Sequence, residues 1–227
     1  MPLQGKDADA NDGKNKNLKT RLVMYFLGLL IMTLGIAVSV KSNLGVSPVS
    51  SIPYTITCVW GMEMGLATIL FHAFLVLLQI LLLRRRFQIK NLLQIAVGVV
   101  FGLFTTFCNT LMGFLPTPEN ILIRLAMILV SVVLIAAGLF LYVPADLVPL
   151  AAEGVTLALV ETSGKPFPRL KVCFDVTVVV ISLVVCLAVL KSPGSVGIGT
   201  VAAAMLVGTV LGFLNRRFGR YRDRWLR

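Results

Sequence analysis

Few polar and ionisable side chains interrupt this strongly apolar sequence, and their spacing limits the chemistry that the chain can support. Asp146, Glu153 and Thr156 follow one another at spacings of seven and three residues, which places them on one face of a helix if the segment is helical. Carboxylates on one face can bind a cation, a proton or the cationic group of a solute. The alternatives are a helix cap or loop residue for Asp146 and a structural ion pair for Glu153.

A second group of polar side chains lies around a proline-interrupted segment in the first half of the chain. Uncharged hydroxyl and amide groups at such a break can hold a polar solute. Helix capping and hydrogen bonds to the backbone are the alternative interpretation for each of them. The group comprises Asn43, Ser47, Ser50, Ser51 and Tyr54.

Two further ionisable side chains occur in apolar surroundings. His72 is the only histidine of the chain, and a strongly apolar stretch follows Asp175. An ionisable group inside a bilayer costs about 2.5–3.5 kcal/mol on insertion scales and tends to face a cavity or a partner. We therefore add both to the candidate substrate-binding residues. The alternatives are simple packing for His72 and pairing with Arg169 or Lys171 for Asp175.

Motifs of catalysis and cofactor binding are missing from the sequence. It has no phosphate-binding P-loop, no nucleophile elbow, no HExxH and no dinucleotide fingerprint. The four cysteines show neither CxxC spacing nor a Cys/His ligand pattern. The sequence therefore predicts a protein that is not an enzyme and that has no cofactor and no metal site.

The elements that must position these side chains are membrane helices. The chain has 227 residues, 57% of them hydrophobic and only 14% charged, and its mean hydropathy is +0.91. A span needs about 20 apolar residues, so about six fit into this length. The sequence predicts an all-α, polytopic membrane protein with spans near 22–40, 64–83, 91–114, 121–143, 170–190 and 197–214.

Two more apolar runs, near 46–60 and 147–160, are too short to cross a bilayer. Both contain proline, and we expect each of them to form a broken or re-entrant half-helix.

The distribution of charge predicts the topology. With the N-terminus inside, six spans place most of the 21 basic residues on the cytoplasmic side, Lys41, Arg124 and Lys191 excepted. The net charge of +11 therefore indicates membrane orientation and not nucleic-acid binding. We expect a disordered cytoplasmic tail over 1–20, a transmembrane domain over 21–215 and a basic cytoplasmic tail over 216–227.

The sequence contains a weak internal repeat, in which part of the first half resembles part of the second half. Residues 35–72 lie over 138–175 at a constant offset of 103 residues, with polar positions coinciding. The corresponding polar pairs are Asn43 with Asp146, Ser50 with Glu153 and His72 with Asp175.

Glycines extend this match at an offset of 110 residues, where Gly98 and Gly102 correspond to Gly208 and Gly212. Each half then contains a span, a broken segment and two spans. An odd number of spans inverts the second half relative to the first, as in many secondary transporters. The predicted repeat halves are about 21–115 and 121–215.

Several short runs resemble the bacterial YczE/YyaS/YitT membrane proteins. The run from Gly35 to Pro48, GIAVSVKSNLGVSP, is similar to the first-helix signature of that family. The runs 65–72, 84–87 and 92–95 are similar to its second and third helices. The resemblance covers most of residues 21–215 and implies a multi-pass protein of the bacterial inner membrane with a transport function and no named substrate. Val49 and Ser50 stand where the family often has tryptophan followed by an acidic residue.

The sequence thus favours a small secondary transporter with its polar site between the two broken segments. Its expected partners are the lipid bilayer, a small solute and a coupling proton or cation, and a homodimer is left open. The alternatives are a substrate-binding membrane subunit of a larger importer and a non-transporting membrane scaffold or regulator. The first alternative predicts an AxxxA pattern in the first helix, which residues 22–40 lack.

Overall fold

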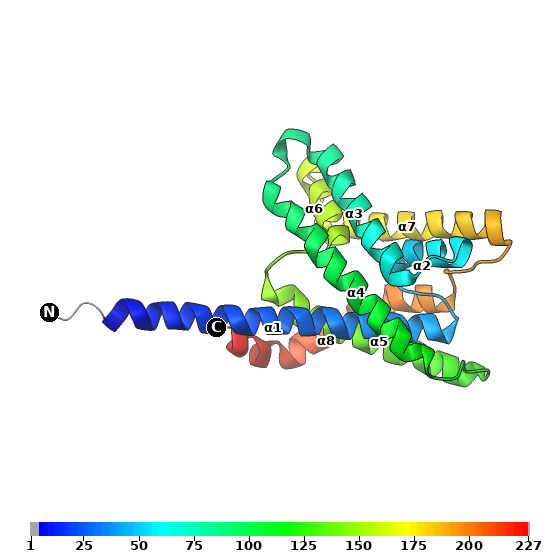
Figure 1. Cartoon of the computed structure of the whole chain (residues 1–227), viewed down its shortest axis with the longest axis horizontal. Helices are drawn as coiled ribbons and strands as arrows, with labels where there is room; N and C mark the ends of the chain where they lie inside the picture. Colours follow the sequence, from blue (N-terminus) through cyan, green and yellow to red (C-terminus); the bar gives the residue numbers. More distant parts are fainter. Residues whose placement is uncertain (1–4, 227) are drawn as a thin grey trace.

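The computed structural model describes the backbone of residues 5–226 and the side chains of residues 18–224, Pro168 excepted. Within these residues all regular structure is helical (Figure 1). The α-helices are α1 (Gly5–Ser42), α2 (Pro48–Trp60), α3 (Met64–Leu83), α4 (Leu93–Gly113), α5 (Ile121–Tyr142), α6 (Ala151–Ser163), α7 (Phe167–Leu190) and α8 (Ile198–Leu226). Three short 3-10 turns join them, namely η1 (Arg84–Arg86), η2 (Ile89–Leu92) and η3 (Val143–Ala145).

Six of the described helices are long and apolar enough to cross a membrane, which confirms the predicted all-α membrane fold. Phe74, Leu77 and Leu81 on α3 are more than half exposed, and such a continuous apolar face requires lipid around it. The spans are Leu18–Ser42, Met64–Arg86, Ile89–Gly113, Ile121–Ala145, Arg169–Leu190 and Ile198–Arg224.

Both polar ends of the chain continue a membrane helix. Residues 5–20, expected to be disordered, form the first turns of α1, which reach beyond the body of the molecule (Figure 1). The rest of that expected tail, residues 1–4, lies outside the described residues. Residues 216–226 of the predicted basic tail are likewise part of α8, which ends at Leu226, and Arg227 lies outside the described residues. Extension of an existing helix needs no new nucleation, so polar residues can prolong an apolar span at little cost.

The two short apolar runs form α2 and α6, each of 13 residues. A helix of this length rises about 20 Å, whereas the hydrocarbon core is about 30 Å thick. Neither helix can therefore cross the membrane, as the lengths of the two runs predict.

The chain breaks before and after these two short helices in the same way. Asn43 precedes α2 with φ of 53°, and Asp146 precedes α6 with φ of 48°. Gly61 and Gly164 end the helices with φ of 69° and 68°. Glycine suits these ends because left-handed backbone strains residues that carry a Cβ. The two members of each pair are separated by the offset of 103 residues.

Helix packing follows a pattern in which most contacts occur twice. α1 packs along α5, α4 packs on α1 as α8 does on α5, and α2 packs on α7 as α6 does on α3. The exception is that α3 packs along α4, whereas α7 and α8 do not form a packed pair in the described chain. Figure 1 shows α8 beside α1 and α5, with α7 in a separate layer.

Glycines bring α1 and α5 together at the centre. A Cβ added to Gly28 would lie 2.8 Å from the carbonyl oxygen of Gly138, so the two backbones touch. A Cβ on Gly35 would lie 2.9 Å from Cγ1 of Ile135, and a Cβ on Gly138 would lie 2.7 Å from Cβ of Met32. The last two contacts correspond to each other at the 103-residue offset.

Candidate substrate-binding cavity

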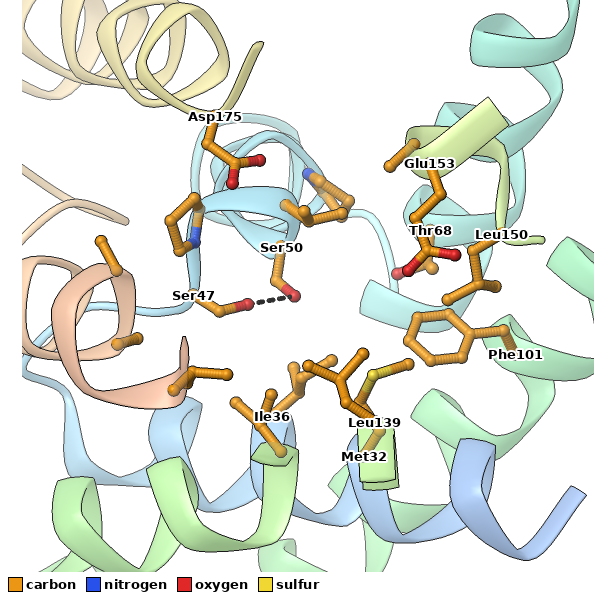
Figure 2. Close-up of a pocket in the computed structure, with 18 of the residues that line it drawn as sticks. Met32, Ile36, Ser47, Ser50, Thr68, Phe101, Leu139, Leu150, Glu153 and Asp175 are labelled. Atoms are coloured by element: carbon orange, nitrogen blue, oxygen red, sulfur yellow. Dashed lines mark hydrogen bonds between the residues drawn. The ribbon is translucent and has the colours of Figure 1, made fainter. Parts of the chain in front are cut away.

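A cavity of about 430 Å³ lies where the helices meet, and each of α1 to α8 contributes to its wall. Figure 2 shows apolar side chains of Met32, Ile36 and Leu139 on one side. Ser50 and Asp175 lie across the space from them. The cavity thus has an apolar side and a polar side, as sites for small organic molecules commonly do.

Glu153 enters the cavity from the first turn of α6. The hydroxyl of Tyr142 donates a hydrogen bond to Oε2 of Glu153 at 2.7 Å and accepts one from the backbone N–H of Leu150 at 2.6 Å. Tyr25 supports this tyrosine, since their ring centroids are 5.2 Å apart and its hydroxyl donates to the carbonyl of Val148. Two tyrosines therefore fix the start of α6 and the position of its carboxylate.

Asp175 and Lys171 form an ion pair one turn apart on α7, and both line the cavity. The pairing with Lys171 that the sequence offered for Asp175 is therefore confirmed. Because the pair also faces the cavity, it is available to a bound solute as well.

Ser47 and Ser50 bring hydroxyl groups from the beginning of α2. The hydroxyl of Ser47 donates to that of Ser50 at 3.0 Å, and both residues line the cavity (Figure 2). Ser51 instead bonds to the carbonyl of Pro48 and accepts from Ser182 of α7, so it joins helices and does not line the cavity.

His72 lies on α3 with only 2% of its surface exposed. Its ring stacks on Phe101 with centroids 5.5 Å apart, and its Nδ1 is buried with no hydrogen-bond partner among the described residues. The side chain lines the cavity, so packing against α4 and contact with a solute are both open to it.

Three of the predicted site residues are absent from the lining of this cavity. Asn43 is exposed at the end of α1, and Tyr54 packs against the apolar core around α1 and α5. The side chain of Asp146 is 95% exposed, with its carboxylate 3.9 Å from Arg21. The prediction that Asp146 shares a helical face with Glu153 is wrong, because α6 begins only at Ala151.

Asp146 and Glu153 both line a second, smaller cavity. Its volume is about 250 Å³, and Tyr25 and Tyr142 also line it. Glu153 therefore lies between this smaller space and the central cavity.

More than half of the residues that line the central cavity fall into pairs 103 apart in the sequence. Phe101 and Leu211 form a further pair at the 110-residue offset. The pairs at 103 are Met32 with Ile135, Ile36 with Leu139, Ser47 with Leu150, Val49 with Ala152, Ser50 with Glu153, Thr68 with Lys171 and His72 with Asp175.

Sequence reasoning missed several contributors to the site. Thr68 and Lys171 belong to it and correspond at the 103-residue offset, which was the signal available for finding them. Phe101 corresponds to Leu211 at the 110-residue offset, which was the signal available for it. Tyr142 had no such signal, because its aromatic ring resembles any other apolar residue of a span until its neighbours are known.

These features define a polytopic α-helical membrane protein with a central cavity of mixed polarity. Residues 19–216 match DUF6198, a family of unknown function, and the chain belongs to this family.

The chain is similar to two proteins of Bacillus subtilis (strain 168), in agreement with the resemblance that the sequence motifs indicated. The chain is 27% identical over 199 residues to the uncharacterized membrane protein YczE, covering 87% of this chain and 86% of YczE. It is 24% identical over 198 residues to the uncharacterized protein YyaS, covering 84% of this chain and 90% of YyaS. No solved structure matches the chain.

Proposed function

We propose that this protein is a small-solute transporter whose two inverted halves close in turn around the central cavity. The observation that carries the proposal is the paired lining of the cavity, in which corresponding residues of both halves face the same space. A solute site at the interface of inverted repeats, next to interrupted helices, is the arrangement of many secondary transporters.

The difference between the halves supports alternation. In the first half, α3 and α4 meet at Gly65 and Gly102, where a Cβ on Gly102 would lie 2.7 Å from the carbonyl oxygen of Gly65. In the second half, a Cβ on Gly208 or Gly212 would meet no described atom within 4 Å. The two helices α3 and α4 of the first half are therefore packed together, whereas their counterparts α7 and α8 in the second half are apart. In the alternative state we expect α7 to pack on α8 and α3 to separate from α4.

The gap between α7 and α8 leads toward basic residues. The first turns of α7 carry Arg169, and the last turns of α8 carry Arg216. Because basic residues collect on the cytoplasmic side, this state is the inward-facing one, in the inner membrane of a bacterium with both termini in the cytoplasm. Glu153 is the group at which we expect a proton or the cationic group of a solute to bind.

Access to the cavity from both sides tests the proposal without knowledge of the solute. The four cysteines are all free, so replacing them and introducing Val49→Cys gives a single thiol in the cavity wall. A transporter that alternates exposes this thiol to a membrane-impermeant maleimide in both right-side-out and inside-out vesicles. Mass spectrometry of the labelled protein measures the result.

Trp60→Cys is the matched control on the same helix. Trp60 is 66% exposed at the end of α2 that lies away from the basic connections, so its replacement should react from that face alone. If the cavity thiol also reacts from one face only, the cavity does not alternate and the transporter proposal is rejected.

A further inference from the structure

The formal charges of the side chains that line the cavity sum to one negative charge when Glu153 is ionised. Its charged lining residues are Glu153, Asp175 and Lys171, with His72 counted as neutral. The ammonium group of Lys171 is engaged by Asp175, and no cation forms an ion pair with Glu153 among the described side chains. The unbalanced charge is therefore that of Glu153.

The hydrogen bonds of Glu153 leave acceptor capacity on its carboxylate. The hydroxyl of Tyr142 donates to Oε2, and the backbone N–H of Leu150 also interacts with the carboxylate. Carboxylate oxygens can accept several hydrogen bonds each. A donor that enters the cavity can thus bind the carboxylate without displacing a protein group.

The walls offer few charged ligands for a bare metal ion. Hard cations take about six or more oxygen ligands, whereas the described residues contain no group of three His, Cys, Asp or Glu side chains suited to a metal. Glu153 and Asp175 also stand apart from each other across the cavity (Figure 2). The largely apolar wall suits a cation that carries its own apolar surface.

The surroundings of Glu153 suit an organic cation. Phe101 lies on the same side of the cavity as the carboxylate (Figure 2), and aromatic faces attract ammonium and guanidinium groups. Met32 and Ile36 offer an apolar surface opposite. The volume of about 430 Å³ lies within the range of sites for small organic ligands, about 300–1,000 Å³.

We infer that the solute is a small organic cation with one positive charge and an apolar body, held by Glu153 and Phe101. This inference rests on the proposed transport function and names its substrate class. The ammonium or guanidinium group binds between the carboxylate and the aromatic ring, and the apolar body lies along α1 and α5.

Three probes with the same phenyl group separate charge from shape, namely 2-phenylethylammonium, 2-phenylethanol and 3-phenylpropanoate. We expect the cation to bind to the protein in lipid nanodiscs, and the alcohol and the carboxylate to bind at least about 10-fold more weakly, the loss of one charged hydrogen bond. Isothermal titration calorimetry measures the three affinities. The inference is overturned if the alcohol or the carboxylate binds as tightly as the cation. It is also overturned if the cation does not bind at millimolar concentration.

Two substitutions move the charge in opposite directions. Glu153→Gln keeps the acceptor for Tyr142 and should weaken cation binding about 10–100-fold, while Lys171→Gln leaves Asp175 unpaired and should strengthen it. Glu161→Gln, an exposed change on the same helix α6, should alter nothing. Unchanged affinity in both cavity variants overturns the assignment.

The two proposals can fail separately. Two-sided labelling of the cavity thiol with no selectivity for the cation leaves a transporter of another substrate class. One-sided labelling rejects transport, whichever probe binds.

Discussion

Replacement of Gly102 by leucine is expected to destabilise the state of the structure, in which α3 packs on α4, by about 3 kcal/mol, the upper end of the usual cost of overpacking. A Cβ at this position would lie 2.3 Å from Cγ1 of Ile69 and 2.7 Å from the carbonyl oxygen of Gly65. The backbone oxygen cannot move unless α3 and α4 separate, so the whole contact between these helices is lost. Unfolding of the purified variant in detergent, followed against temperature, measures the effect.

Gly212→Leu is the matched control, because Gly212 corresponds to Gly102 at the 110-residue offset. A Cβ on Gly212 would meet no described atom within 4 Å, so we expect little change in the unfolding temperature. Equal destabilisation by the two substitutions would show that α8 is as tightly packed as α4, in conflict with the separation of α7 from α8.

The same Gly212→Leu variant is expected to lose access to the cavity from the outer face. In the alternative state, Gly212 would approach Val172 as Gly102 approaches Ile69. A leucine at this point keeps α7 and α8 apart by its bulk, so the protein stays folded in the inward-facing state. The single cavity thiol of Val49→Cys should then react with the impermeant maleimide from the basic face alone.

Gly113→Leu provides the control for this second effect. Gly113 ends α4, where an added Cβ would again meet no described atom within 4 Å, and it has no part in the proposed closure. Two-sided labelling should persist in this variant. Two-sided labelling in Gly212→Leu as well would mean that α7 and α8 need not approach each other during access.

The spans could be predicted because the thickness of the hydrocarbon core sets a minimum length for an apolar run that crosses it. Six runs of this chain reach that length. The short helices followed from the same argument, since the runs around Pro48 and Pro149 are too brief to cross. The offset of 103 residues also pointed to cavity residues, because Ser50 and Glu153, or His72 and Asp175, occupy corresponding positions.

The direction in which a polar side chain points could not be predicted in the same way. In a soluble helix the apolar stripe marks the buried face, whereas a membrane helix is apolar toward both lipid and protein. Periodicity therefore assigned Asp146 to the helix of Glu153, although the helix begins only after Leu150. That start depends on the hydrogen bond from the backbone of Leu150 to Tyr142, a tertiary contact with no local signal.

The most direct test of alternating closure is a disulfide between α7 and α8. In a background without the native cysteines, Val172→Cys with Gly212→Cys should cross-link under mild oxidant in membranes, because the closed state brings them within the Cα separation of about 7 Å that a disulfide allows. Ser51→Cys with Ser182→Cys is the positive control, since their hydroxyl oxygens lie 3.0 Å apart. A cross-link in both pairs is the predicted result. Complete cross-linking of the control pair, with none between α7 and α8, would contradict the alternating transporter.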